Sequence, residues 1–386
     1  MRVLLAISDL ALHGAQKQVV ELARELDRLG HAVAIYTLND DIPRAKELAG
    51  TGVEVVADQK RSRLDRAVLG RLRAKIVDFG AEIVHGFLYD ADIYVRLAAI
   101  GTGAVVLNSE RSDNYTLSRT QLIAHFLTLP LVDGVVANSS SGSRFAQRYL
   151  RYAESRMHVV WNGMRLDELE KKAVSSVDYR TEFFGDPSVK VACMVGHIKP
   201  AKDYPLAVEV AAALLRKAPD WRVLFLGEAL SHAADYAAGR DSDTSNYKRA
   251  VLQQYEALGL TESRVRFAGV RADVPAILAQ CDVQFMTSRW EGFPNVVLEG
   301  MTLGVPVVST DYSDIRLILP RASQVIGSRA PEEMADAILA AHKDRDAIVA
   351  EQKRWVREHA SIERAARRLE GVYEHYLRRE PRAQAA

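Results

Sequence analysis

Short apolar runs rich in β-branched residues alternate with amphipathic stretches along the whole 386-residue chain. Continuous apolar runs of this kind are typical of parallel strands that are covered on both faces. In the first half the runs cover residues 3–7, 33–36, 53–56, 83–87, 105–107 and 135–137, and in the second half residues 191–195, 223–226, 265–267, 283–286, 305–309 and 324–326. The alternation predicts βαβ units and therefore an α/β fold with doubly wound sheets.

The length and the number of runs predict two domains. A chain of this size exceeds one typical core, because domains of about 150–200 residues are usual. About six strands in each half make two Rossmann-like domains in tandem, and the turn signal Asn162-Gly163 marks the boundary. We expect an N-terminal domain at residues 1–165 and a C-terminal domain at residues 166–360. Residues 361–386 should form a C-terminal helix that packs back on the N-terminal domain and ends in a frayed tail.

The composition argues against several classes of protein. The net charge is only +1, so nothing global points to a nucleic-acid partner. The two cysteines, Cys193 and Cys281, do not make a disulfide framework, and a reducing cytoplasm fits them best. The first apolar run is followed too soon by Asp9 and His13 to be a signal peptide.

No apolar stretch approaches the roughly 20 residues that a membrane span requires. The longest candidate, residues 122–132, is interrupted by His125 and Pro130. We favour a packed helix and a following strand there, over a segment that dips into a membrane.

A basic run, KRSRLDRAVLGRLRAK, occupies residues 60–75. We favour the solvated face of a helix, with Leu64, Leu72 and Ile76 turned inward. Attraction to a membrane surface is the alternative interpretation.

The densest chemical signal is the segment SRWEGFPNVVLEGMTLG between two predicted strands of the second half. Gly292 allows close backbone approach to a ligand, and Pro294 suits the first turn of a helix. Free backbone N–H groups around residues 293–295 would face an anion.

Two carboxylates frame the same segment, Glu291 in the loop and Glu299 eight residues later on the predicted helix. Ligands of open parallel sheets bind outside the carboxyl ends of the strands, which is where this loop lies. The pattern therefore suits a phosphate at the N–H groups and hydroxyls at the carboxylates. An ordinary βα loop with two solvated glutamates is the alternative.

This motif, EGFPNVVLEGMTLGVPVVSTD, closely resembles the retaining glycosyltransferases of family 4. The resemblance implies their GT-B fold, in which two Rossmann-like doubly wound domains face each other across a cleft. It covers most of the chain, with weaker matches at residues 14–33, 82–87, 134–139, 159–164, 195–208 and 265–270.

The resemblance also implies roles for matching positions. Glu299 would accept hydrogen bonds from the ribose hydroxyls, and Glu291 would contact the transferred sugar. Lys202 would pair with the diphosphate, the backbone near Val270 would meet the base, and Gly14 would let the first loop approach the phosphates. The donor's phosphates and sugar would be held by the backbone of a short segment: Gly292, Phe293, Pro294 and Asn295.

Two departures from the family pattern concern the phosphates. His13 and Gln16 stand where the family usually has a second glycine and an acidic residue. His197 stands where it usually has arginine, which thins the positive charge there. Because His197 occupies the position of that arginine, we group it with Lys202 and Glu291 as the catalytic candidates.

Two residues of the first half are further candidates for a sugar or acceptor contact. Arg111 follows a predicted strand near the point where the family often has a histidine facing the donor sugar, and a structural salt bridge is an equal alternative. His85 lies at a strand end, where a satisfied core-edge histidine is the favoured interpretation.

The implied function is retaining transfer of a hexosyl or N-acetylhexosaminyl group. The donor, expected to be a UDP-sugar, binds the C-terminal domain, and a glycan or lipid-linked acceptor of surface polysaccharide synthesis binds the N-terminal domain. We expect no cofactor and no metal, because no paired-Asp motif suited to Mg²⁺ or Mn²⁺ occurs. The expected location is cytoplasmic, with peripheral contact at the inner face of the membrane.

Three other functions compete with this one. A nonhydrolysing sugar-nucleotide epimerase would bind the same donor without an acceptor. A noncatalytic GT-B partner subunit would keep the fold without the chemistry, although Glu291, Glu299 and Lys202 are all retained. An NAD dehydrogenase is disfavoured, because no complete G-x-G-x-x-G follows the first strand.

Overall fold

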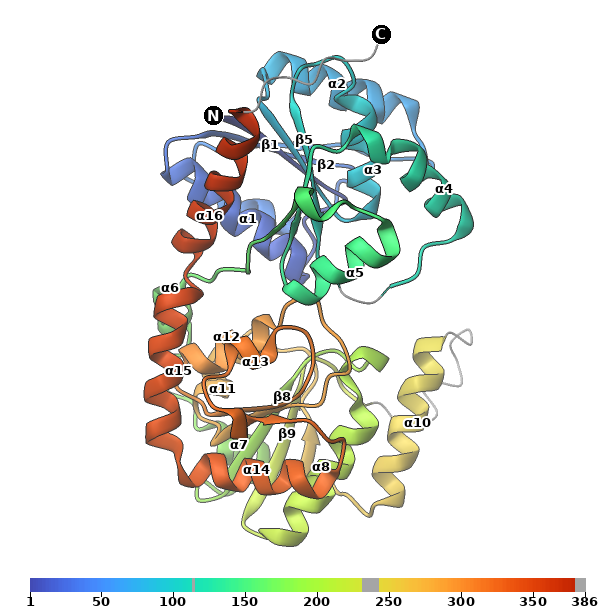
Figure 1. Cartoon of the computed structure of the whole chain (residues 1–386). Helices are drawn as coiled ribbons and strands as arrows, with labels where there is room; N and C mark the ends of the chain where they lie inside the picture. Colours follow the sequence, from blue (N-terminus) through green and yellow to red (C-terminus); the bar gives the residue numbers. More distant parts are fainter. Residues whose placement is uncertain (113–114, 231–242, 379–386) are drawn as a thin grey trace. The chain divides into compact units, whose positions relative to one another are not determined.

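The computed structural model describes residues 1–112, 115–230 and 243–378. The chain divides into two compact units (Figure 1). Unit 1 comprises Met1–Met164 together with Ala360–Ala386, and unit 2 comprises Arg165–His359. The tail, residues 380–386, for which we expected fraying, lies outside the described residues.

Unit 1 is built on a parallel sheet of seven strands in the order β3-β2-β1-β4-β5-β6-β7. The strands are β1 Arg2–Ile7, β2 Ala32–Thr37, β3 Glu54–Ala57, β4 Ile83–Phe87, β5 Val105–Glu110, β6 Gly134–Ala137 and β7 Met157–Val159. The helices are α1 Gly14–Arg28, α2 Arg66–Phe79, α3 Tyr89–Ala98, α4 Arg119–Thr128, α5 Ser140–Leu150 and α16 Ile362–Leu377, with 3-10 turns η1 Pro43–Leu48, η2 Leu129–Leu131 and η3 Glu154–Arg156.

Unit 2 is built on a parallel sheet of six strands in the order β10-β9-β8-β11-β12-β13. The strands are β8 Lys190–Val195, β9 Trp221–Leu226, β10 Val265–Phe267, β11 Val283–Met286, β12 Val307–Thr310 and β13 Val325–Ile326. The helices are α6 Leu166–Lys172, α7 Tyr179–Phe184, α8 Tyr204–Lys217, α10 Asp243–Ala257, α11 Val274–Ala279, α12 Asn295–Thr302, α13 Ile315–Ile318, α14 Pro331–Lys343 and α15 Arg345–His359, with 3-10 turns η4 Pro200–Lys202 and η5 Ala322–Gln324.

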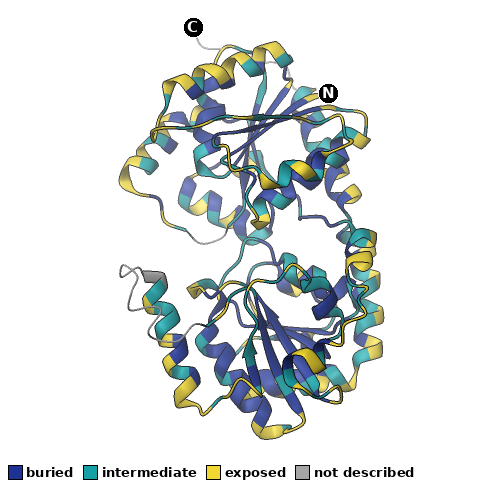
Figure 2. Cartoon of the chain, turned by 180° about the vertical axis from the view of Figure 1, so that it is seen from behind, coloured by how far each residue is buried: buried dark blue, intermediate teal, exposed yellow. Residues whose placement is uncertain are grey.

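Every apolar run that predicted a strand forms one, and the doubly wound α/β fold is confirmed. The runs are continuous because both faces of each sheet are covered. In β1, Val3 and Leu5 pack on the side of α1 and α16, whereas Leu4 and Ala6 pack on the side of α2 and α3. The central strands of both sheets are accordingly buried (Figure 2). The extra strand, β7, is a three-residue edge strand that the pattern missed.

The C-terminal helical region is divided between the two units. The chain breaks after α15, and Ser361 caps α16 by accepting from the Arg364 N–H at 3.3 Å. The Met164 N–H donates to the Ala360 carbonyl and the Ile362 N–H donates to the Met164 carbonyl, each at 2.9 Å. This exchange ties the start of α16 to unit 1, where Leu369 lies in the core with α1.

None of the helices, over the residues that the structure describes, combines the length and the apolar character needed to cross a membrane.

Candidate functional site

The strand order of unit 2 reverses between two central neighbours. From β8 the chain winds outward through β9 and β10, whereas from β11 it winds through β12 and β13. Loops at the carboxyl ends of two such strands diverge and leave a crevice, which is where open α/β sheets bind ligands. Lys202 lies in the loop after β8 and Glu291 in the loop after β11.

Lys202 and Glu291 form an ion pair at this point. The Lys202 Nζ donates to Glu291 Oε1 at 2.7 Å, and the Ser288 hydroxyl donates to the same oxygen at 2.5 Å. Lys202 is 7% exposed, and an ammonium group so little exposed requires a charged or strongly polar partner. The pair therefore places one cation and one carboxylate together at the carboxyl edge of the sheet.

Several contacts hold the Lys202 loop in place. Asp203 has a left-handed backbone (φ 49°) and directly precedes α8, and its carboxylate accepts from Arg289 Nε at 2.9 Å and from Arg329. The Thr287 hydroxyl donates to the Lys202 carbonyl at 2.8 Å. The backbone that carries the lysine is thus fixed from both central loops, which orients its side chain before any ligand binds.

Two glycines make room for the lysine side chain. A Cβ at Gly227, whose φ is +123°, would lie 2.6 Å from the Gly196 carbonyl oxygen. A Cβ at Gly196 would lie 2.9 Å from the Lys202 Cε. Glycine at position 196 therefore lets the Lys202 side chain lie against the backbone, and glycine at position 227 lets the loop after β9 approach the Gly196 backbone.

Further charged groups surround the same loop. Desolvation and the neighbouring Lys202 charge lower the pKa of Lys199. The His197 side chain is 61% exposed, and its Nδ1 lies 4.0 Å from Glu228 Oε2. The Glu228 carboxylate also binds Lys248. His197 therefore lies on the loop of the candidate site but faces Glu228 rather than the Lys202–Glu291 pair.

The start of α12 differs from what the sequence predicts. We expected free N–H groups around residues 293–295, but Pro294 has none and the Asn295 N–H donates to the Phe293 carbonyl at 3.0 Å. The local turn consumes that donor. Glu299 lies on α12, partly exposed.

Two other residues that were predicted to contact the sugar donor, Gly292 and Val270, also lie at the carboxyl edge of the sheet. The Gly292 carbonyl accepts from the Ser313 hydroxyl at 3.0 Å, which ties the β11 loop to the loop after β12. Val270 follows the end of β10 and is 78% exposed. The predicted positions of unit 2 thus all lie in or after loops at the carboxyl ends of its strands.

Unit 1 contains the other predicted residues, Gly14, His85 and Arg111. Its strand order reverses between β1 and β4, and Gly14 is the exposed first residue of α1 after the β1 loop. The structure does not support a ligand contact for His85, which is fully buried on β4. Both ring nitrogens are satisfied, by the Tyr373 hydroxyl and the Ser109 hydroxyl at 2.8 Å each, and burial followed by the Arg111 charge lowers its pKa well below the usual value.

Arg111 lies beside this buried histidine. Its guanidinium stacks on the Phe87 ring at 4.8 Å, and its two terminal nitrogens donate to Asn162 Oδ1 at 2.9 Å and to the Ser109 hydroxyl at 3.2 Å. Its Nε is buried and has no hydrogen-bond partner among the described residues. These contacts are hydrogen bonds rather than the salt bridge that we considered.

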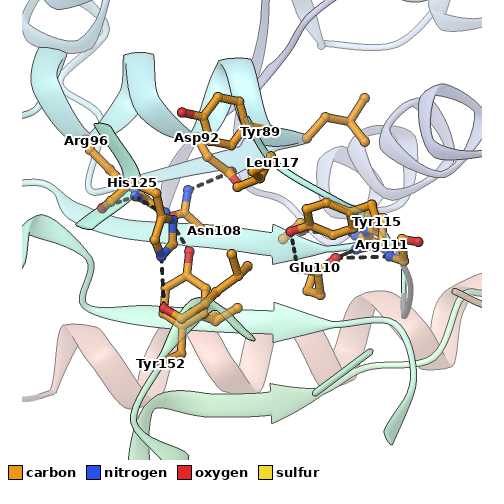
Figure 3. Close-up of a pocket in the computed structure, with 15 residues that line it drawn as sticks. Tyr89, Asp92, Arg96, Asn108, Glu110, Arg111, Tyr115, Leu117, His125 and Tyr152 are labelled. Carbon is orange, nitrogen blue, oxygen red and sulfur yellow. Dashed lines mark hydrogen bonds between the residues drawn. The ribbon is translucent and has the colours of Figure 1, made fainter. Parts of the chain in front are cut away.

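Arg111 also lines a cavity of about 280 Å³ within unit 1 (Figure 3). Its walls come from α3, the end of β5 and the segment after it, α4, β6 and the end of α5. The lining residues are Leu88, Tyr89, Asp92, Arg96, Asn108, Ser109, Glu110, Arg111, Ser112, Tyr115, Leu117, His125, Val135, Leu150 and Tyr152. The cavity combines aromatic rings with charged and amide groups, a composition typical of small-molecule sites.

A buried hydrogen-bond network forms one wall of this cavity. Arg96 is 1% exposed and donates to Asn108 Oδ1 at 2.9 Å, to the Thr128 hydroxyl at 3.0 Å and to the Tyr152 hydroxyl at 2.5 Å. Asn108 in turn donates to Asp92 Oδ1 at 2.6 Å. We did not predict this network from the sequence. Its signal was a pair of charged residues, Asp92 and Arg96, at helical spacing on an otherwise apolar face.

Two carboxyl groups of the cavity have strongly shifted pKa values. Burial raises the pKa of Asp92 to about 8, against the opposing effect of the Arg96 charge. Burial likewise raises the pKa of Glu110 to about 7, although Glu110 accepts hydrogen bonds from the Ser112 N–H at 3.1 Å and the Tyr115 hydroxyl at 3.0 Å. A carboxyl group that stays protonated near neutral pH can donate a hydrogen bond to a ligand.

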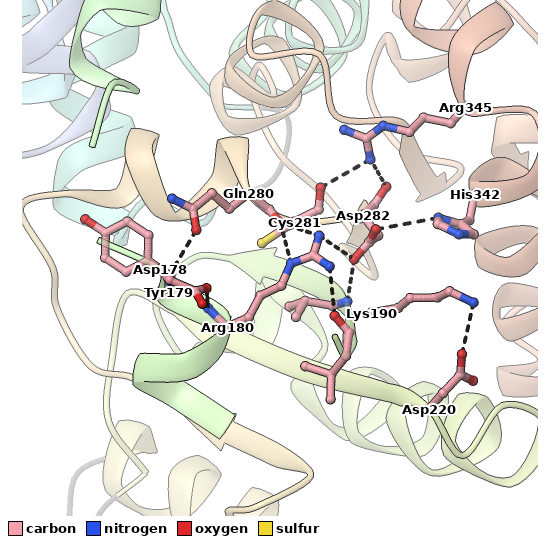
Figure 4. A network of polar contacts seen from close by, with 12 residues as sticks. Asp178, Tyr179, Arg180, Lys190, Asp220, Gln280, Cys281, Asp282, His342 and Arg345 are labelled. Carbon is pink, nitrogen blue, oxygen red and sulfur yellow. Dashed lines mark hydrogen bonds and ion pairs between the residues drawn. The ribbon is translucent and has the colours of Figure 1, made fainter. Parts of the chain in front are cut away.

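A charged cluster at the opposite edge of the unit 2 sheet has a structural role (Figure 4). Asp282, which precedes β11, accepts from the Val191 N–H at 2.7 Å and pairs with Arg180 at 3.1 Å. Arg345 donates to the Asp282 carbonyl at 2.8 Å. These contacts join the starts of two strands to α7 and α15, away from the carboxyl edge where ligands of such sheets bind.

Two family models match the chain. The model described as Glycosyltransferase Family 4 matches residues 12–168, and the model described as Glycosyl transferases group 1 matches residues 189–344. The second match includes Lys202, Glu291 and Glu299, and the first includes the lining of the unit 1 cavity.

Curated relatives match part of the chain. The lipopolysaccharide core biosynthesis mannosyltransferase LpsB of Rhizobium meliloti is 28% identical over 201 residues, which are 50% of this chain and 54% of that protein. The Vi polysaccharide biosynthesis protein VipC/TviE of Salmonella typhi is 27% identical over 192 residues, 48% of this chain and 30% of that protein. The match thus spans about half of the first relative's length and less of the second's.

Solved structures match almost the whole chain. HepE of Anabaena in complex with UDP aligns with a TM-score of 0.79 at 18% identity, covering 97% of this chain and 100% of that one. A glycosyltransferase from Rickettsia africae aligns with a TM-score of 0.80 at 18% identity, covering 98% and 99%. This likeness establishes the GT-B fold.

The raised pKa of Asp92 predicts a pH-dependent stability. Because the folded state holds the Asp92 proton more tightly than the unfolded state, its contribution is full below the unfolded pKa near 4 and fades as pH rises through about 8. The unfolding midpoint of the wild type should therefore fall relative to that of Asp92→Asn between pH 6 and 9, measured by circular dichroism. Parallel curves for the two proteins would contradict the assignment.

Proposed function

We propose that this chain, which belongs to the family-4 glycosyltransferases, transfers a sugar from a nucleotide-diphosphate donor to a glycan or lipid-linked acceptor in surface polysaccharide synthesis. The observation that carries the proposal is the Lys202–Glu291 pair at the strand-order reversal of unit 2. The names of the relatives LpsB and VipC/TviE support the polysaccharide context.

We assign the donor to unit 2 and favour a UDP-linked hexose or N-acetylhexosamine. HepE, which shares the fold, was crystallised with UDP and with UDP-glucose, and this supports the choice of nucleotide. Lys202 would move its hydrogen bond from Glu291 to the diphosphate, with Lys199 nearby; His197 would reach the diphosphate only by turning away from Glu228. Glu291 would then bind hydroxyls of the transferred sugar, and Glu299 those of the ribose.

The proposed chemistry breaks the bond between the anomeric carbon and the phosphate oxygen. The electron pair leaves with the nucleoside diphosphate, and the Lys202 ammonium stabilises the charge that develops there. The acceptor hydroxyl forms the new bond on the face that the diphosphate leaves, and its proton passes to a phosphate oxygen. The anomeric configuration is therefore retained without a dedicated protein base.

We assign the acceptor to unit 1, where Arg111 and the tyrosines of the cavity offer ring faces and donors for a sugar. The proposed location is the cytoplasm, with peripheral contact at the inner face of the membrane if the acceptor is lipid-linked. The rival epimerase would need no acceptor. A noncatalytic subunit would not need a buried Lys202–Glu291 pair oriented by Asp203.

A panel of nucleotide sugars tests the proposal. A UDP-sugar at 100 times its dissociation constant should stabilise the chain by about 2.7 kcal/mol, measured as a thermal shift. With that donor, nucleoside diphosphate should be released only when a second sugar or a lipid-linked sugar is added. Turnover of the donor to an isomer without an acceptor would instead favour the epimerase, and no turnover with any pair would favour the noncatalytic subunit.

Different kinetic effects are expected at the two glutamates. Glu299→Ala should raise KM for the donor with little change in kcat. The lost binding free energy should be about 1–3 kcal/mol, the cost of leaving the ribose hydroxyls unpaired. Glu291→Gln should lower kcat, because it changes a group at the moving sugar while keeping an acceptor for Lys202 and Ser288. Glu256→Ala, at an exposed position on α10, serves as the control. Identical kinetic profiles for the two site variants would contradict the assigned roles.

We further propose that transfer requires no metal ion, since Lys202 supplies positive charge where the diphosphate would bind. Activity should survive excess EDTA in a steady-state transfer assay with the donor identified above. Loss of activity that Mg²⁺ or Mn²⁺ restores would show that a metal shares this task.

A further inference from the structure

Helix α4 of unit 1 buries polar residues and exposes apolar ones. Its buried residues are His125 and Thr128, at 2% and 7% exposure, whereas Ile123, Phe126 and Leu127 are 59%, 42% and 76% exposed. Surface helices normally turn their apolar stripe toward the core. Here two polar side chains are buried, and three of the four large apolar side chains, all but Leu122, face outward.

The inward polar face explains why the helix keeps this orientation. The His125 ring shares a hydrogen bond with the Leu150 carbonyl at 3.0 Å and meets the buried Arg96 guanidinium at 3.4 Å. The Thr128 hydroxyl accepts from the same guanidinium at 3.0 Å. The network of the cavity wall thus anchors α4 by its polar side, and rotating the helix to hide its apolar side would break these bonds.

The outward side chains form a contiguous patch. Ile123, Phe126 and Leu127 are spaced three and four residues apart, so they share one face within little more than a turn. Exposed apolar residues that stand singly are common, but a cluster on one helix face marks an interaction surface. We predicted a packed helix here; the helix is present, and its packed side combines Leu122 with the buried polar residues His125 and Thr128.

The charges around this patch are positive. From Tyr115 to Val132 the chain has no acidic residue, and it has one basic side chain besides the buried His125, the exposed Arg119. Burial and the Arg96 charge lower the pKa of His125 to about 4, so this histidine adds no positive charge near neutral pH. The basic run before and at the start of α2 adds exposed cations, Arg61, Arg63 and Arg66. Leu64, which we expected to turn inward, is 52% exposed because α2 begins only after it, at Arg66.

The basic segment before α2 and helix α4 both form hydrogen bonds with α3. The Asp65 N–H donates to the Tyr94 hydroxyl of α3 at 2.6 Å, and the Tyr89 hydroxyl of α3 donates to the Gln121 carbonyl of α4 at 2.8 Å. In Figure 1, α2, α3 and α4 follow one another along unit 1, and α3 contacts both of the others. The acidic groups nearby are engaged, since Asp90 pairs with Lys60 and Asp65 caps α2.

We propose that the apolar face of α4, flanked by the cations of residues 61–66 and Arg119, docks on a membrane surface that contains acidic lipids. The apolar side chains enter the boundary between headgroups and acyl chains, and the arginines pair with lipid phosphates. The surface is defined by its own residues and does not depend on the transfer reaction. If that reaction is as proposed, docking concentrates the chain where a lipid-linked acceptor is found.

Cosedimentation of the full chain with vesicles tests the surface. Wild type should bind vesicles of phosphatidylglycerol and phosphatidylcholine, and bind pure phosphatidylcholine more weakly. The triple variant Ile123→Ser, Phe126→Ser, Leu127→Ser should lose affinity by about tenfold or more. Arg61→Gln, Arg63→Gln, Arg66→Gln should weaken binding to acidic vesicles and flatten its dependence on salt.

A matched control uses exposed apolar residues of unit 2. Val174→Ser, Leu258→Ser, Leu317→Ser removes side chains that are 85%, 37% and 56% exposed, and should bind vesicles as wild type does. Unchanged thermal midpoints would show that each variant folds.

Two results would overturn the proposal. The first is equal vesicle binding by wild type and the α4 variant. The second is a wild-type dimer in sedimentation velocity that the α4 variant does not form, which would assign the face to a second copy of the chain. The donor-induced thermal shift should persist in the α4 variant. This measurement therefore tests the transfer proposal independently of the membrane proposal.

Discussion

Both sheets are covered on two faces, and this constraint organises the molecule. Because a strand such as β1 sends Val3 and Leu5 to one helix layer and Leu4 and Ala6 to the other, its interior has no place for a charged group. Charged groups that meet the unit 2 sheet therefore lie at the ends of its strands. At the carboxyl edge these loops build the candidate site, and at the opposite edge Asp282 with Arg180 and Arg345 joins helices to strand starts.

The Lys202–Glu291 pair follows from the same constraint. A lysine only 7% exposed must be paired, and the partner available is the carboxylate of the neighbouring central loop. The surrounding contacts, through Asp203, Thr287 and the close approach at Gly196, hold the ammonium group in place. A cation whose backbone is held in place in advance needs only a small side-chain movement to stabilise charge that develops beside it.

Unit 1 contains a buried hydrogen-bond network centred on Arg96. Arg96 connects α3, β5, α4 and the segment after α5 through hydrogen bonds with side chains from each. The network holds the cavity open on one side and fixes the orientation of α4 on the other. One arginine thus links the proposed acceptor site to the proposed membrane surface.

The sequence by itself determined the fold class, the strands and the central site motif, because period and spacing are local properties. The apolar runs predicted every strand except the short edge strand β7, and the spacing of Glu291 and Glu299 marked the loop after β11. Only the tertiary structure decided what lies across from each residue. It made His85 a core residue between Tyr373 and Ser109 and turned His197 toward Glu228. It also tied the start of α16 to unit 1 through a backbone exchange with Met164. These outcomes depend on partners far away in the chain, so no local pattern could specify them.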